Sequence, residues 1–283
     1  MMYKIGLSTP CGLITDENLA SHNAVGFDVI EISDAMDGYA RFDFDRAHAL
    51  LEKYGIKPHS MHLPFSPFTE LDLSNPALAE RTLEYYRGII EKGTRIGVKI
   101  FVIHPSGEPI KDEARALRMA TAKQSLAVLA EIAGEHGAVI AVENLPRTCL
   151  GKNSAEIAEL LSAHSALRAC FDTNHLLSEN TADFMRNIGE KIITTHISDY
   201  DFVNERHWLP GEGKVDWQKV ISVLREIGYS GPWIYELGFA CPKTILRDRA
   251  LTCEDFARNA AELFAGEELT VISRPKPNLG WWE

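Results

Sequence analysis

Residues 139–173, VIAVENLPRTCLGKNSAEIAELLSAHSALRACFDT, decide the fold of this chain. The segment begins with a short apolar run, VIAVEN (139–144), continues through a helical stretch, and ends with a second short run, RACFDT (168–173). A strand, a helix and a second strand in this order predict two parallel strands joined by a right-handed crossover. Each of the two runs carries an acidic side chain near its end, Glu143 and Asp172.

The same unit repeats along the whole chain. Six further runs have strand character: YKIGLS (3–8), DVIEIS (28–33), PHSMHL (58–63), KIFVIH (99–104), IITTHI (192–197) and PWIYEL (232–237). Helical stretches with apolar residues at three- and four-residue spacing follow them, and glycines such as Gly55 and Gly228 mark helix ends just before a strand. Eight such units in 283 residues predict an α/β fold, a single-domain (β/α)8 TIM barrel, which typically needs about 250 residues. A doubly wound open sheet is the alternative, but no GxGxxG motif follows the first strand.

The predicted barrel takes up most of the chain. We assign residues 1–265 to the barrel and residues 266–283 to a C-terminal tail that contains Trp281 and Trp282. This tail is expected either to pack on the barrel or to form a subunit contact in a homo-oligomer.

Composition limits the classes of partner. The chain has 29 basic and 40 acidic side chains, a formal net charge of −11, so binding to nucleic acid is disfavoured. Its five cysteines are scattered without a CxxC pair, which fits reduced thiols. The start, MMYKIGLSTP, lacks the features of a secretory signal, and no stretch approaches the roughly 20 apolar residues of a membrane span. We therefore expect a cytoplasmic protein without a membrane segment.

Polar side chains lie at the ends of six predicted strands. They are His62, His104, Glu143, Asp172, His196 and Glu236. Each has the same parity in its strand as the residues expected to fill the barrel, so the six side chains should converge over the barrel axis. Barrel enzymes have their active sites at this face. Carboxylates gathered in an apolar funnel repel each other unless a cation neutralises them, so the set predicts a divalent metal site.

The donor types narrow the ion and allow more than one site. Imidazole and carboxylate together suit Zn, Mn, Fe or Co, and carboxylates with water suit Mg or Mn, so we expect Mn, Mg, Zn or Co. His175, Glu205 and His207 extend the set, and with His62 and His104 they could hold a second or third ion. Alternatively, these side chains form hydrogen bonds with substrate hydroxyls or support the ligands of one ion.

Several motifs at these positions resemble a known family. They are MHLP (61–64), VIHPSG (102–107), IAVENLP (140–146), CFDTNH (170–175), HISDYD (196–201), HWLPGEGKVDW (207–217) and IYELGF (234–239). In order and spacing they resemble the xylose isomerase-like TIM-barrel superfamily, which includes sugar phosphate isomerases and epimerases, inosose dehydratases and the endonuclease IV group.

The resemblance implies roles for individual residues. In the epimerase branch, one divalent ion is bound at the positions of Glu143, Asp172, His196 and Glu236, and the two glutamates act as acid and base. His175, and either Arg206 or His207, match positions that bind substrate hydroxyls. The endonuclease IV branch uses three zinc ions and adds the positions of His62, His104, His175, Glu205 and His207. Glu205 departs from that branch, which has an aspartate at this position.

These observations predict a metal-dependent isomerase. The expected reaction interconverts small keto and aldo sugars through a metal-stabilised enediolate, with Glu143 and Glu236 as acid and base. Phe65, Phe68, Trp208 and Phe239 are candidates for an apolar wall that excludes water. Two alternative enzymes are an inosose dehydratase-like lyase and an endonuclease IV-like abasic-site phosphodiesterase. A non-catalytic sugar-binding or assembly role is the alternative from another class.

Overall fold

The computed structural model describes residues 3–65 and 70–276. Eight parallel strands form a closed barrel in sequence order, with β1 pairing to both β2 and β8. The strands are β1 (Ile5–Thr9), β2 (Val29–Ser33), β3 (Lys57–His62), β4 (Ile100–Ile103), β5 (Val139–Glu143), β6 (Arg168–Asp172), β7 (Ile192–Ile197) and β8 (Trp233–Tyr235). All eight predicted strands are confirmed, each with bounds within two residues. The TIM barrel is therefore confirmed, and the open-sheet alternative is wrong.

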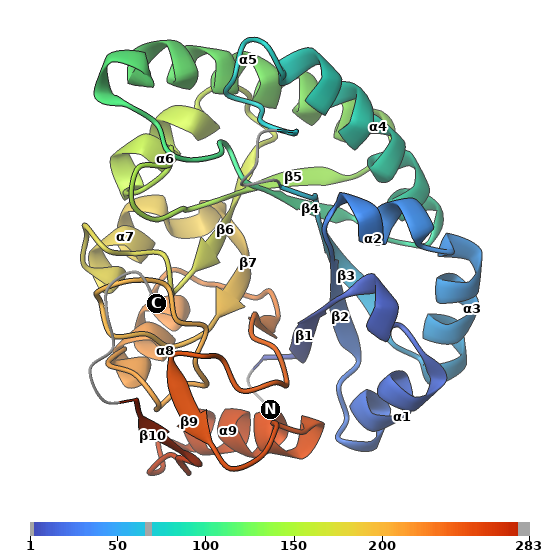
Figure 1. Ribbon diagram of the computed structural model, residues 1–283, viewed down its shortest axis with the longest axis vertical. Helices are drawn as coiled ribbons and strands as arrows, with labels where there is room; N and C mark the ends of the chain where they lie inside the picture. The colour runs from blue at the N-terminus through green and yellow to red at the C-terminus, as the bar shows by residue number, and fades with distance from the viewer. Residues whose placement is uncertain (1–2, 66–69, 277–283) are drawn as a thin grey trace.

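Helices surround the barrel as an outer layer (Figure 1). They are α1 (Asp16–Ala24), α2 (Met36–Arg41), α3 (Phe44–Tyr54), α4 (Ala79–Arg95), α5 (Asp112–Glu135), α6 (Ser154–Leu161), α7 (Thr181–Ile188), α8 (Trp217–Glu226) and α9 (Cys253–Ala265), with short 3-10 turns at η1 (Cys11–Leu13) and η2 (Gly189–Lys191). Side-chain caps start several of them: the Asn153 side chain accepts from the Glu156 N–H at 2.9 Å. Gly55 and Gly228 adopt positive φ angles of 65° and 70°, as expected for glycines that end helices.

Alternation along the strands separates two apolar cores. Val102, Ala141 and Cys170 form a small cluster with Ile100 and Ile193. Intervening residues such as Ile140 and Val142 belong to the larger core that includes helix side chains. Because Glu143 and Asp172 share the parity of Ala141 and Cys170, their side chains follow the small inner cluster at the carboxyl ends of the strands.

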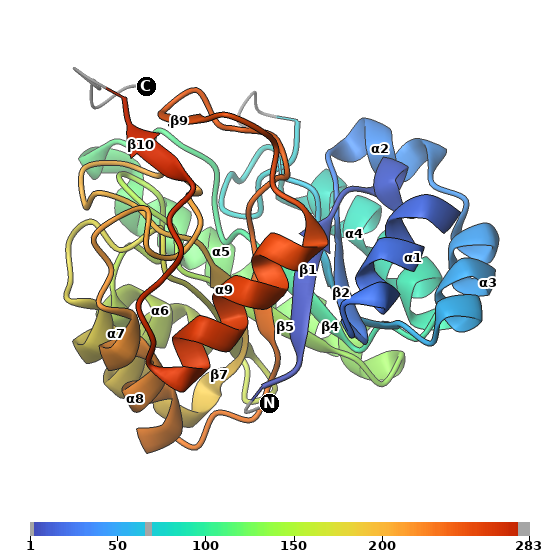
Figure 2. The same cartoon turned by 90° about the horizontal axis from the view of Figure 1, so that it is seen from below.

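The tail is described as far as residue 276. Its strand β10 (Ser273–Pro275) pairs antiparallel with β9 (Ile245–Arg247), and Leu269 and Ile272 pack against the large core. Figure 2 shows this ribbon at the end of the barrel opposite the start of β1. Trp281 and Trp282 lie outside the described residues, so a subunit contact of the tail stays a prediction. All five cysteines are free thiols, and no helix in the described part of the chain is long and apolar enough to cross a membrane.

A buried carboxylate closes the loop that follows β7. Asp199 is fully buried, and its oxygens accept from the backbone N–H groups of Tyr200, Gly211 and Val215 at 2.8, 2.8 and 3.1 Å. The indole N–H of Trp217 donates to the same carboxylate at 2.9 Å. This loop carries residues 205–207, which the sequence analysis assigned to the site, so Asp199 sets the shape of one wall of that site.

We predict that Asp199→Ala lowers the free energy of unfolding by about 3 kcal/mol, because the substitution leaves several buried N–H donors without an acceptor. The urea midpoint measured by circular dichroism tests this. Asp248→Ala is the control, since the Asp248 side chain is 94% exposed, and it should leave the midpoint unchanged. A midpoint for Asp199→Ala equal to that of the control would contradict the role of Asp199.

Candidate metal centre

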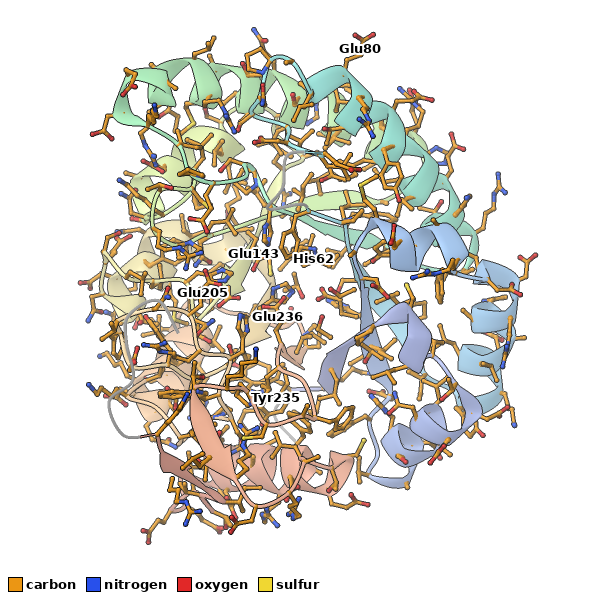
Figure 3. The ribbon with its side chains drawn as sticks, viewed as in Figure 1. His62, Glu80, Glu143, Glu205, Tyr235 and Glu236 are labelled. Atoms are coloured by element: carbon orange, nitrogen blue, oxygen red, sulfur yellow. The ribbon has the colours of Figure 1, made fainter. Side chains whose placement is uncertain are left out.

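The six predicted strand-end side chains converge at one mouth of the barrel. The strands β3, β5 and β6 end at His62, Glu143 and Asp172, and His196 is the last residue but one of β7. His104 and Glu236 directly follow β4 and β8. Figure 3 shows His62, Glu143 and Glu236 close together near the barrel centre, with Glu205 beside them and Glu80 on the outer surface. Glu143, Asp172 and His196 have no exposed surface, so their charges are held away from bulk water.

Glu143 lies at the centre of this cluster and faces imidazoles with both oxygens. Its Oε2 atom is 3.0 Å from His62 Nε2 and 3.3 Å from His104 Nε2. Its Oε1 atom is 3.1 Å from His196 Nδ1 and 3.4 Å from His175 Nδ1. The carboxylate therefore separates two groups of donors, one around each oxygen.

Backbone carbonyls fix the ring orientation of three histidines. His62, His175 and His207 each have Nδ1 within hydrogen-bond distance of a backbone carbonyl oxygen, at 2.8, 2.9 and 3.0 Å. A carbonyl oxygen can only accept, so Nδ1 carries a proton in each ring and Nε2 is the nitrogen that faces the site. A metal-binding histidine is usually held in this way, with one nitrogen donating to the protein and the other free to coordinate.

Two further carboxylates complete the inner group. Asp172 Oδ2 is buried and has no hydrogen-bond partner, while its Oδ1 accepts from the Asn174 N–H at 2.5 Å. Glu236 Oε1 lies 3.3 Å from His196 Nδ1, the nitrogen that also faces Glu143. Potential ligand atoms of His62, Glu143, His196 and Glu236 all lie within 4.8 Å of one another, as do those of Glu143, Asp172 and His175.

The carboxylates and imidazoles of the inner group shift one another's pKa values. Burial alone would raise the pKa of Glu143, but the imidazoles of His196 and His104 outweigh burial and hold that pKa well below its usual range. Burial raises the pKa of Asp172 and, with the carboxylates of Glu143 and Asp172 nearby, raises the pKa of Glu236 well above its usual range. Asp172 Oδ2 lacks a hydrogen bond and lies 3.4 Å from His175 Nδ1. This oxygen and the crowded carboxylates fit the donor set of a divalent cation.

The sequence analysis missed one buried carboxylate, Glu31 of β2. Its Oε1 atom is 2.9 Å from His196 Nε2, an ion-pair contact rather than an aligned hydrogen bond. The hydroxyls of Ser8 and Ser60 donate to the Glu31 carboxylate at 2.9 and 2.7 Å. Although burial opposes ionisation, His196 and the other donors lower the pKa of Glu31 to about 2. Glu31 lies in the middle of β2, below the ring of strand ends, so the pattern of polar strand ends does not include it.

A second cluster, made of His175, Glu205 and His207, lies beside the inner group. Glu205 Oε2 is 3.9 Å from His175 Nε2 and 3.9 Å from His207 Nε2. Of the two alternatives for a substrate-binding position, His207 lines the cavity, whereas Arg206 is buried and donates from Nε to Asp201 at 2.9 Å. Arg206 is not among the described residues that line the cavity.

A cavity of about 140 Å³ opens over both clusters. Phe65 lines it, and its ring stacks on that of His104 with centroids 4.0 Å apart. Trp208 is not among the described residues that line the cavity. It is buried, and its indole N–H donates to Thr244 at 2.9 Å, so it supports the loop after β7. Phe239 packs on the core next to Phe256, and Phe68 lies outside the described residues.

Glu108 and Arg147 also line this cavity, and the sequence analysis did not select them. Both lie in loops that follow site strands, Glu108 after β4 and Arg147 four residues after Glu143. Their positions at the carboxyl side of the barrel were a signal that could have found them. Arg147 has a positive φ of 52°, an uncommon backbone conformation for a residue other than glycine.

Comparisons with known proteins show which sequences and folds this chain is similar to. The chain is 26% identical over 220 residues to a ketose 3-epimerase of Arthrobacter globiformis, which covers 75% of this chain and 73% of the relative. It is 23% identical over 194 residues to a probable endonuclease 4 of Thermoplasma acidophilum, covering 62% and 65%. A solved structure of a D-tagatose 3-epimerase-like protein superposes with a TM-score of 0.72 at 23% identity, covering 83% of this chain and 90% of that one.

The family described as "Xylose isomerase-like TIM barrel" matches residues 19–254. This match spans most of the chain, including seven of the eight strand ends described above and the two loops that carry Arg147 and His207. The resemblance found in the sequence motifs is thereby confirmed, and the chain belongs to the xylose isomerase-like TIM-barrel family.

Proposed function

We propose that this protein is a divalent-metal-dependent sugar isomerase or epimerase. The observation that carries the proposal is the pair of glutamates, Glu143 and Glu236, that face the same nitrogen of His196 at 3.1 and 3.3 Å. Two carboxylates on one ligand set can act as acid and base on opposite sides of a bound substrate. The likeness to a ketose 3-epimerase over three quarters of the chain supports this chemistry.

Four residues would hold the principal ion: Glu143, Asp172, His196 and Glu236. The Asp172 oxygen that lacks a hydrogen bond, and the mixture of imidazole and carboxylate, suit Mn, Mg, Zn or Co. His62 and His104, on the other oxygen of Glu143, would hold a second ion if one binds. When bound, a divalent ion supplies a Lewis acid that makes a proton beside a sugar carbonyl easier to remove.

The chain's own residues would then move that proton. One of Glu143 and Glu236 takes the proton from the carbon beside the carbonyl, which leaves an enediolate. Return of a proton to the neighbouring carbon gives an isomer, whereas return to the opposite face of the original carbon by the partner glutamate gives an epimer. His175 and His207 present Nε2 toward the cavity and would orient substrate hydroxyls. The Phe65 ring, stacked on His104, would cover the sugar and reduce access of water.

A second candidate, phosphodiester cleavage at abasic DNA, has one specific observation in its favour. The histidines of all three zinc positions implied by the endonuclease IV resemblance lie around this cavity or the inner group, and one relative is a probable endonuclease 4. The net charge of −11 disfavours binding to a polyanion. Nicking of an abasic duplex by the metal-loaded protein would favour this second candidate over the first.

We predict that Glu143→Gln and Glu236→Gln each lower kcat/KM by about 10²- to 10⁴-fold, because each removes one proton-transfer group. The assay screens ketoses and inososes by NMR in D2O, where proton removal places deuterium on the carbon beside the carbonyl. Glu80→Gln, on the outer surface of α4, is the matched control and should retain full activity. Full turnover by either site variant would contradict the assignment.

Metal removal should abolish turnover. We expect chelation followed by dialysis to stop deuterium incorporation, and addition of Mn, Mg, Co or Zn to restore it, since the substrate proton is too weakly acidic without a Lewis acid. Undiminished turnover by chelated protein, with elemental analysis confirming that no metal is left, would contradict metal dependence. A product with new ultraviolet absorbance from a conjugated carbonyl would instead indicate the lyase alternative.

Glu31 should affect metal binding without contacting the ion. Its contact with His196 Nε2 holds that ring so that Nδ1 faces Glu143 and Glu236. We predict that Glu31→Gln weakens Mn²⁺ binding by about 10- to 100-fold in calorimetric titrations, as loss of such supporting contacts typically does. Glu80→Gln should bind Mn²⁺ with wild-type affinity. Unchanged affinity in a correctly folded Glu31→Gln protein would show that His196 does not depend on Glu31.

A further inference from the structure

Arg147 is the only cationic Lys or Arg side chain among the described residues that line the cavity. The residues outside the described part, 1–2, 66–69 and 277–283, contain no Lys or Arg. A sugar phosphate needs a cationic or N–H-rich anchor for its phosphate group. Whether Arg147 is available to serve as that anchor therefore bears directly on the class of substrate.

All three nitrogens of the Arg147 guanidinium already have partners. Nε donates to Glu108 Oε2 at 3.1 Å, and Nη2 donates to the other oxygen of the same carboxylate. Nη1 lies 2.5 Å from Glu205 Oε1 and donates to the Asn204 side-chain oxygen at 2.8 Å. A bidentate carboxylate on one edge and a second carboxylate on the other leave little of the guanidinium to bind an incoming anion.

The charge at this end of the cavity is negative. Glu108 and Glu205 carry two negative charges against the single positive charge of Arg147, and the side chains of Glu108 and Arg147 are 31% and 30% exposed. A phosphate dianion placed here would be repelled by the two carboxylates across a partly desolvated space. Two more acidic side chains line the cavity, Asp72 and Glu236. Asp72 is paired with Arg118, which is not among the described lining residues, and Glu236 belongs to the inner group.

The remaining groups of the wall suit neutral hydroxyls. A hydroxyl can donate to a carboxylate oxygen and can either donate to or accept from an imidazole nitrogen, and Glu205 Oε2, His175 Nε2 and His207 Nε2 offer such partners. The Phe65 ring provides an apolar surface for the C–H groups of a sugar. We propose that the substrate is an unphosphorylated sugar, because the Glu108–Arg147–Glu205 cluster disfavours binding of a phosphate group. This inference rests on the proposed function.

The direct test compares substrates in the wild-type, metal-loaded protein. Ketohexoses and ketopentoses are assayed beside their terminal phosphate esters by deuterium incorporation. We expect kcat/KM for the best neutral sugar to exceed that for its ester by about 100-fold, the effect of unpaired like charges at a recognition site. A higher kcat/KM for the phosphate ester would overturn the inference while leaving the proposed isomerase function intact.

A charge-removing variant tests the cause. Glu108→Gln frees one edge of Arg147 and should lower KM for the phosphate ester by about tenfold, with a smaller effect on the neutral sugar. Glu226→Gln is the matched control, because Glu226 also accepts from both Nε and Nη2 of an arginine, Arg186, on the outer surface. An unchanged KM for the ester in folded Glu108→Gln protein would overturn the role given to the cluster.

A binding measurement separates failure of the inference from failure of the function. If none of the sugars or esters is turned over, the isomerase proposal fails, but the cavity can still be probed with a hexitol and its phosphate monoester. Calorimetric titration of the Mn²⁺-loaded protein should then give tighter binding of the neutral hexitol. Tighter binding of the monoester would overturn the inference independently of any catalytic activity.

Discussion

The structure depends on a single buried carboxylate that four imidazoles surround. Glu143 is fully buried, and each of its oxygens faces two histidines, at 3.0–3.4 Å. A charge in this position is tolerated only because opposite charge and hydrogen-bond donors replace water around it. The closed barrel supplies that arrangement, since it brings histidines at or just after the ends of β3, β4, β6 and β7 to the Glu143 side chain.

Supporting contacts keep these donors in place. Backbone carbonyls orient three histidines, Glu31 holds His196 from below, and Asp199 fixes the loop that brings Glu205 and His207 over the cavity. A further carboxylate, Glu108, accepts hydrogen bonds from Arg147, the one Lys or Arg among the described residues that line the cavity. The site is thus specified by two layers: ligand atoms that face inward, and buried acids or carbonyls that set their direction.

The fold and the convergence of the inner side chains were predictable, whereas the outer wall was not. Strand parity is a local property with a period of two residues, so Glu143, Asp172 and His196 could be placed on one face from the sequence alone. Glu31 obeys the same parity but lies lower in its strand, where side chains usually fill the core. The partners of Arg147 and the burial of Arg206 and Trp208 away from the cavity depend on loop conformations that no short sequence pattern specifies. These conformations include the positive φ angles of Arg147 and His207.

The central claim is that this ring of acids and imidazoles binds a divalent cation. A crystal of the protein soaked in Mn²⁺, with data collected above and below the manganese absorption edge, tests it most directly. The account predicts an anomalous peak bonded to Glu143, Asp172, His196 and Glu236. An absent peak at full soaking concentration, or a peak held by other residues, would contradict the account.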